Sequence, residues 1–175
     1  MRKLKTIELE RKSLDQFKES PKIPLVVILD NLRSLHNVGS VFRTADAFRV
    51  KKLILVGITA TPPNKEIQKT ALGATQSVEW EYFKDIQDTI NSLKKENICL
   101  ISVEQTTNSQ TLESLQLDKE KTYGLIFGNE VSGVNQWAID QSDFCVEIPQ
   151  EGTKHSLNVS VCSGIVLWEF YKQLR

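Results

Sequence analysis

The sequence contains few of the residues that build disulfide-linked or metal-binding proteins. Among its 175 residues are three cysteines, Cys99, Cys145 and Cys162, and two histidines. The cysteines are odd in number and far apart, and each falls within an apolar run, so we expect buried free thiols and not a disulfide framework. No Cys-x-x-Cys or cysteine–histidine spacing is present, and we therefore expect no metal site.

The chain also lacks a segment of the kind that enters a membrane. No apolar run approaches the roughly 18 to 20 residues that a membrane-spanning helix needs. Residues 1–5 are basic but are followed by charged residues, whereas a secretory signal continues with an apolar core. We therefore expect a cytoplasmic protein.

Length and composition fit one ordinary domain. The chain falls within the roughly 100 to 200 residues of a typical domain. Its hydrophobic fraction of 40% and charged fraction of 25% are those of a folded globular protein. No repeat, low-complexity tract or linker interrupts it, so we expect a single domain over residues 1–175, with a basic helical extension at residues 1–22.

The net charge of zero conceals an uneven distribution. The first 52 residues carry twelve Lys/Arg and six Asp/Glu, and the remainder carries ten and sixteen. A basic surface can bind the phosphates of a nucleic acid, because that attraction does not depend on sequence. Charge alone leaves open that this surface is simply a solvated charged face.

Apolar runs without alternation predict a parallel sheet. Short β-branched runs bounded by turn residues are typical of strands buried on both faces, and helical segments separate them. The predicted strands are 25–29, 53–56, 98–103, 123–127 and 144–148, and the predicted helices are 1–20, 40–48, 83–97, 135–140 and 157–174. This order indicates an α/β fold with a mostly parallel sheet flanked by helices.

The familiar nucleotide-binding motifs are missing. No Gly-x-Gly-x-x-Gly spacing occurs. Gly128 and Gly133 have the interval of a phosphate-binding loop, but Val134 and Asn135 stand where that loop needs a lysine and a serine or threonine. Without the lysine the phosphates lose their cation, so nucleotide hydrolysis is disfavoured.

Three polar clusters instead follow predicted strands, at residues 30–48, 127–133 and 148–161. Ligands of parallel α/β sheets bind at the carboxyl ends of the strands. The clusters supply arginine, asparagine, glutamate and serine side chains together with glycine-bearing backbone. Such loops can enclose a polar small molecule.

Each cluster also has a purely structural interpretation. Asn31 or Ser40 could cap one helix, and Ser156 and Asn158 could cap the last one. Glu130 could be an acidic residue in the first turn of a helix, facing the helix dipole. The residues by themselves leave both interpretations open.

The clusters NLRSLHNVGSVFRTADAF, IFGNEVSGV and IPQEGTKHSLNVSVCSGIVLWEF resemble motifs 1, 2 and 3 of the SpoU (TrmH-like) branch of the SPOUT RNA methyltransferases. The segment KTALGATQSV, residues 69–78, resembles the one that such proteins carry after their second strand. The similarity covers nearly the whole chain beyond about residue 22, in the family's order and spacing.

The resemblance implies a fold whose C-terminal segment forms a deep trefoil knot. It implies methyl transfer from S-adenosyl-L-methionine to a ribose 2′-hydroxyl of tRNA or rRNA, in a homodimer with each site near the subunit interface. Since the chain has no separate RNA-recruiting domain, tRNA is favoured over rRNA.

The resemblance also assigns the cofactor site. Gly128, Ile148 and Leu157 are expected to bind S-adenosyl-L-methionine largely through their backbone groups. Glu130 and Ser156 are expected to line the same pocket.

The catalytic residues implied by the family are Arg43, Asn37, Glu130, Ser156 and Asn158. Asn37 is expected to hold the loop of Arg43, and Asn158 to order the pocket. A guanidinium with a pKa above about 12 is a poor general base. We therefore expect Arg43 to fix a substrate phosphate and to stabilise the developing oxyanion.

Two other function classes stay open. A non-catalytic RNA-binding or assembly factor could retain this fold, although it would not need all five of these residues. A small-molecule transferase unrelated to RNA is disfavoured by the basic N-terminal third.

Overall fold

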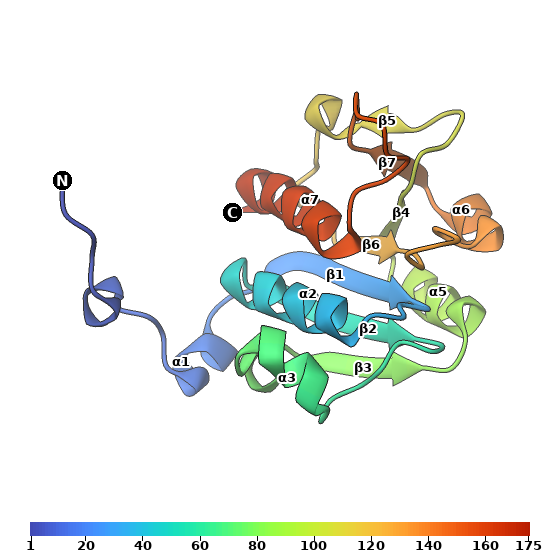
Figure 1. Ribbon diagram of the computed structural model, residues 1–175. Helices are drawn as coiled ribbons and strands as arrows, with labels where there is room; N and C mark the ends of the chain where they lie inside the picture. The colour runs from blue at the N-terminus through green and yellow to red at the C-terminus, as the bar shows by residue number, and fades with distance from the viewer.

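A seven-stranded sheet forms the centre of the computed structural model, which describes residues 1–175 except for the side chain of Thr6 (Figure 1). The strands run in the order β3-β2-β1-β6-β4-β7-β5, and every neighbouring pair is parallel. Their bounds are β1 Ile23–Asp30, β2 Val50–Val56, β3 Trp80–Phe83, β4 Cys99–Val103, β5 Gln110–Thr111, β6 Tyr123–Phe127 and β7 Phe144–Glu147. The predicted parallel α/β fold is confirmed.

The central strands are apolar on both faces because helices cover both sides. In β1, Leu25 and Val27 face one hydrophobic core, whereas Val26 and Ile28 face the other. All four side chains are at most 2% exposed. This burial explains why the strand has no alternation of apolar and polar residues.

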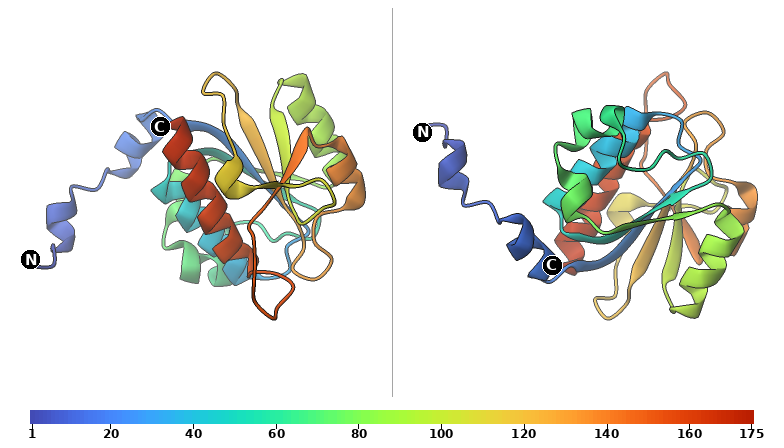
Figure 2. Two further views of the ribbon diagram at one scale, coloured as in Figure 1. Left: turned by 90° about the horizontal axis from the view of Figure 1, so that it is seen from above. Right: turned by 90° about the horizontal axis from the view of Figure 1, so that it is seen from below.

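Two helical layers enclose the sheet (Figure 2). One layer holds α2 Leu35–Ala47, α3 Lys65–Ala71, α4 Ala74–Ser77 and α7 Val159–Leu174, and the other holds α5 Ile86–Lys95 and α6 Gln136–Gln141. Within the first layer α2 packs between α7 and α3. The remaining short helices are Thr6–Leu9, α1 Leu14–Glu19 and Leu112–Ser114.

The N-terminal helical prediction holds only in part. Residues 1–20 form two short helices, because Glu10 adopts the left-handed conformation (φ 45°) that ends the first of them. In Figures 1 and 2 this segment extends away from the sheet.

Helix α2 begins earlier than predicted. The Ser34 side chain caps it by accepting from the N–H of Asn37, so the helix starts at Leu35 and Ser40 lies inside it. The interpretation of Ser40 as a cap is therefore wrong. Asn31 caps nothing either, and instead adopts a left-handed conformation at the end of β1 (φ 56°).

Two further helices begin a few residues later than predicted. Asp85 caps α5, which begins at Ile86 and not at residue 83. Asn158 caps α7, as its structural interpretation proposed, and the helix begins at Val159.

The three thiols are free, as expected, although only Cys145 is fully buried, while Cys99 and Cys162 are partly buried. Within the described residues, no helix combines the length and the apolar character that crossing a bilayer requires.

Candidate active site

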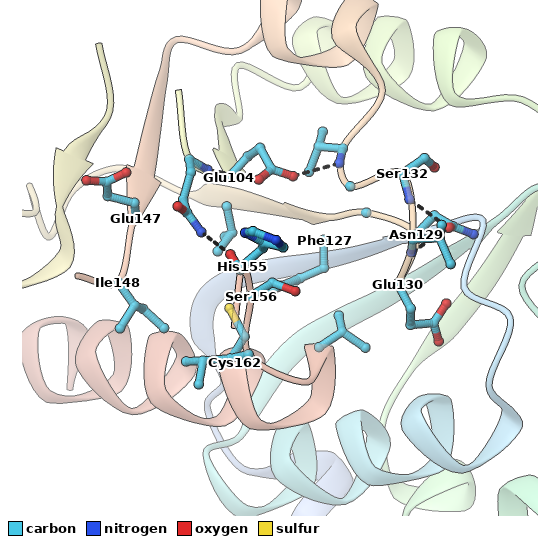
Figure 3. Close-up of a pocket in the computed structure, with 18 of the residues that line it drawn as sticks. Glu104, Phe127, Asn129, Glu130, Ser132, Glu147, Ile148, His155, Ser156 and Cys162 are labelled. Atoms are coloured by element: carbon cyan, nitrogen blue, oxygen red, sulfur yellow. Dashed lines mark hydrogen bonds between the residues drawn. The ribbon is translucent and has the colours of Figure 1, made fainter. Parts of the chain in front are cut away.

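A cavity of about 740 Å³ opens at the carboxyl edge of the sheet, beside β4, β6 and β7 (Figure 3). Its lining is drawn mainly from residues 103–105, 127–134, 146–148 and 155–159. Open parallel sheets bind ligands at this edge.

Most of the site residues predicted from the sequence meet in this cavity. Those that line it are Gly128, Glu130, Ile148, Ser156, Leu157 and Asn158. The second and third polar clusters, whose nearest ends are residues 133 and 148, therefore form walls of one site.

The second cluster is a tight loop held together by its own backbone. Asn129 and Gly133 exchange two backbone hydrogen bonds, of 3.0 and 2.9 Å. Gly133 has φ +69°, and a Cβ at Gly128 would overlap the backbone of Gly133 and Val134. Glycine is thus required at both positions for the loop to close beside the cavity.

Glu130 connects this loop to the start of α2. Its carboxylate accepts hydrogen bonds from the backbone N–H of Arg33 (2.9 Å), the backbone N–H of Ser34 (3.0 Å) and the side-chain amide of Asn37 (3.0 Å). Partial burial raises the pKa of Glu130, but these donors outweigh it, and the pKa lies below its ordinary value of 4.5. The interpretation of Glu130 as a first-turn acid is wrong, because the residue lies in a loop outside any helix. Its carboxylate instead faces the N-terminus of α2, which is distant in sequence.

Asn37 and Asn158 complete the connection between the three clusters. The Asn158 amide donates to the side-chain oxygen of Asn37 at 3.3 Å, and its own oxygen accepts from the N–H of Ser160 at 2.9 Å. Asn37 is 9% exposed and lies outside the cavity lining. It bonds to Glu130 and to Asn158, and so joins one cluster to the other two.

The structure does not bring Arg43 into the cavity of its own chain. The residue lies on the exposed face of α2 and is absent from the cavity lining. Within the described part of the chain its guanidinium has no ion pair. An α-helix rises about 1.5 Å per residue, which places Arg43 roughly 9 Å along the axis from Asn37.

Sequence reasoning missed Glu104, which directly follows β4. Its carboxylate accepts from the N–H of Val134 at 3.0 Å and from the N–H of Gln105 at 2.9 Å. Gln105 in turn donates to the backbone oxygen of His155 at 2.9 Å. The end of β4 therefore contacts both the 128–134 loop and the C-terminal segment. The signal that could have revealed Glu104 is its position directly after a predicted strand.

A smaller cavity of about 370 Å³ lies against the same loop and includes Asp30 at the end of β1. Asp30 is 2% exposed, and its one side-chain donor is the Asn31 amide, at 2.9 Å. Burial, and then the nearby charge of Asp85, raise the pKa of Asp30 to about 6.

Fold and site together define an α/β protein whose ligand cavity, at one edge of a parallel sheet, is walled by two polar clusters and braced from outside by a third. Residues 24–168 match the model of the SpoU rRNA Methylase family, and the chain belongs to that family.

Individual relatives agree with this assignment. A 23S rRNA (guanosine-2′-O-)-methyltransferase of Coxiella burnetii is 30% identical over 161 residues, which are 92% of this chain and 62% of the relative. The solved TrmH/SpoU tRNA modifying enzyme of A. aeolicus superimposes with a TM-score of 0.80 and 27% identity, over 91% of this chain and 80% of that one. An AdoMet-bound rRNA methyltransferase from Sinorhizobium meliloti superimposes with a TM-score of 0.80 and 26% identity, over 94% of this chain and 62% of that one.

The chain spans 62 to 69% of the length of the first curated relatives that it matches.

Proposed function

We propose that this protein transfers a methyl group from S-adenosyl-L-methionine to a ribose 2′-hydroxyl of RNA, with tRNA favoured over rRNA, and that it acts in the cytoplasm. The meeting of two polar clusters in one cavity, joined to the third through Asn37, carries the proposal. Membership of the SpoU family supports it, as does the 2′-O activity named for the Coxiella relative. The tRNA modifying enzyme, of which the chain covers 80%, supports the choice of tRNA.

The cavity suits the proposed cofactor in size and in charge. Its volume of about 740 Å³ lies within the range of small-molecule pockets. Three carboxylates and no lysine or arginine line it, which favours a cation such as a sulfonium. The tight backbone at Gly128 leaves main-chain groups, without a side chain, on the cavity wall.

In this proposal the backbone at Gly128, Ile148 and Leu157 binds the cofactor, and Ser156 lines the same pocket. When bound, the cofactor supplies an activated methyl group. Glu130 and Asn158 act by holding the walls in place, since their polar atoms are already bonded to α2 and α7. Correct alignment of the reacting atoms can contribute up to about 7–11 kcal/mol, so a rigid site is itself catalytic.

Arg43 would reach a cavity from a second copy of the chain. Beside it, α7 exposes an apolar stripe formed by Val161 (51% exposed), Ile165 (40%) and Trp168 (45%). These residues recur at helical spacing on one face, and α7 packs directly against α2. A homodimer that covers this stripe would bury the faces of both helices and bring Arg43 next to the partner's site.

At that site Arg43 would bind a substrate phosphate and stabilise the oxyanion that develops on the ribose. An Arg43→Lys variant is expected to lose most activity in single-turnover assays, because an ammonium cannot replace the two-pronged guanidinium. Near-normal rates in this variant would contradict the role.

We further propose that residues 148–158 are threaded to form the trefoil knot of the family. The hydrogen bond from Gln105 to the backbone of His155, which ties this segment to the end of β4, supports a fixed path. A crystal structure traced through residues 120–160 tests it.

The test of function combines binding and product mapping. Calorimetry with S-adenosyl-L-methionine distinguishes the enzyme from a non-catalytic RNA-binding factor, which need not bind it. Incubation with total tRNA and rRNA, followed by mapping of 2′-O-methyl sites, then identifies the substrate. No cofactor binding, or no new methylation in either RNA, would refute the proposal.

Mixing two inactive variants tests the shared site. Arg43→Ala and Ser156→Ala chains, refolded together, should recover about a quarter of the normal sites if each site combines residues of two chains. Recovery of no activity, with mixed dimers verified by mass spectrometry, would place Arg43 and Ser156 in the same site of one chain.

A further inference from the structure

The cavity is acidic in a way that the motif residues do not explain. Its titratable side chains are Glu104, Glu130, Glu147, His155 and Cys162, and no lysine or arginine lines it. None of the three carboxylates belongs to an ion pair in the described part of the chain. Their negative charge is therefore not neutralised by a nearby cation.

The three carboxylates differ in how they are placed. Figure 3 shows Glu130 and Glu147 on opposite sides of the cavity, with Glu104 between them. Glu130 is directed at the N-terminus of α2, which compensates its charge. Glu147 accepts a hydrogen bond from the Ser109 hydroxyl at 2.9 Å, beside the edge strand β5.

Glu104 is held in the middle of the site by backbone on two sides. Its oxygens accept from Gln105 and Val134, and a Cβ at Gly133 would overlap the Glu104 carboxylate. Glycine at 133 thus permits the close approach of this carboxylate to the loop. The two hydrogen bonds fix the position of both carboxylate oxygens.

The charge of Glu104 also acts on other groups in the cavity wall. Burial, and then the negative charge of Glu104, raise the pKa of the Cys162 thiol to about 11. A negative charge that disfavours a thiolate there favours a cation in the same space.

We infer that Glu104 is a specificity residue that makes the cavity prefer the cationic sulfonium donor over the neutral thioether product. The inference rests on the proposed function and deepens it. During transfer the breaking S–CH₃ bond leaves its electron pair on sulfur, the methyl carbon bonds to the ribose oxygen, and the hydroxyl proton is released to solvent. The positive charge on sulfur is thereby lost. A fixed carboxylate then attracts the sulfonium of the donor, a charge that S-adenosyl-L-homocysteine lacks, and this difference favours product release.

The test compares the affinities of donor and product in Glu104→Gln. The amide removes the charge and keeps one acceptor oxygen, which can serve only one of the two N–H groups, that of Val134 or that of Gln105. The affinity for the product, which has no sulfonium, therefore measures any disturbance of the loop. Calorimetry should show S-adenosyl-L-methionine binding weakened about tenfold and S-adenosyl-L-homocysteine binding nearly unchanged. Sinefungin, which carries an ammonium group in place of the sulfonium, should weaken together with the donor.

The matched control is Glu113→Gln, which removes an exposed carboxylate of a short helix outside the cavity. It should leave both affinities unchanged. Equal weakening of donor and product in Glu104→Gln would show that Glu104 acts through the loop or through the ammonium group that both molecules carry. No change in either would show that its charge is screened. Both results overturn the inference while leaving the proposed function intact. A wild-type chain that binds neither donor nor product refutes the proposed function itself, and the inference with it.

Discussion

Replacing Glu130 by glutamine tests whether this carboxylate holds the site together. In the folded protein it accepts three hydrogen bonds from α2 and the residues just before it. The amide of Glu130→Gln offers one acceptor oxygen and turns N–H groups toward the remaining donors. Hydrogen bonds to a charged group contribute about 1.5–3 kcal/mol each, and partial exposure of Glu130 lets water replace some of this. We expect the free energy of unfolding to fall by about 2 kcal/mol at pH 7.

The stabilisation by Glu130 is expected to depend on pH, in a direction set by its pKa shift. The folded-state pKa of Glu130 lies below its ordinary value of 4.5, so the ionised carboxylate stabilises the fold above about pH 4.5. This contribution is lost as the pH falls through the folded-state pKa. The glutamine cannot titrate, and the stability difference between the two proteins should therefore shrink between pH 5 and about pH 3.

Urea unfolding followed by circular dichroism measures both quantities. Glu113→Gln serves as the control, with an expected change within about 0.5 kcal/mol. A loss below about 0.5 kcal/mol for Glu130→Gln at pH 7, or a difference that stays constant down to pH 3, would refute the reasoning.

Three further predictions concern single residues. Asp30→Asn should stabilise the fold by about 1–2 kcal/mol at pH 7. The pKa of Asp30 is raised from 3.8 to about 6, so the wild-type protein loses stability as the pH rises from 3.8 to about 6, and the asparagine variant does not. Urea titrations at pH 4 and pH 7 check this, and a gain of equal size at both would contradict it. Gly128→Ala should abolish cofactor binding in calorimetry while the chain keeps its circular dichroism spectrum, because its Cβ would meet the backbone of Gly133; wild-type affinity would contradict it. Trp168→Glu should convert a dimer into a monomer in sedimentation analysis, whereas Glu113→Gln should not; an unchanged dimer would place the interface elsewhere.

The buried part of the fold was predictable from the sequence because burial leaves a strong pattern. Strand β6 has the predicted bounds, Tyr123–Phe127, since it is apolar on both faces. Strand β3, Trp80–Phe83, was missed because its residues are partly exposed at the sheet edge and include Glu81. Helix α2 was predicted to start five residues late because its first turn carries polar side chains such as Asn37.

The site was predictable as a set of loops but not as a network of bonds. The resemblance places Gly128, Leu157 and Asn158 in one pocket, and in the structure all three line one cavity. That Glu130 bonds to α2 depends on a contact between residues nearly one hundred positions apart, which no local pattern encodes. The position of Arg43 outside its own cavity likewise follows from tertiary packing.

Helix α7 links two parts of the protein that would otherwise be independent. The N-cap of the helix, Asn158, lies in the cavity wall. Trp168 lies on the outer face of the helix ten residues later, about 15 Å along the helix axis. A contact that shifted the outer face of the helix would shift its first turn as well. If such a contact changed the affinity of the cavity for a ligand, thermodynamic reciprocity requires that the ligand change the affinity of the contact by the same factor.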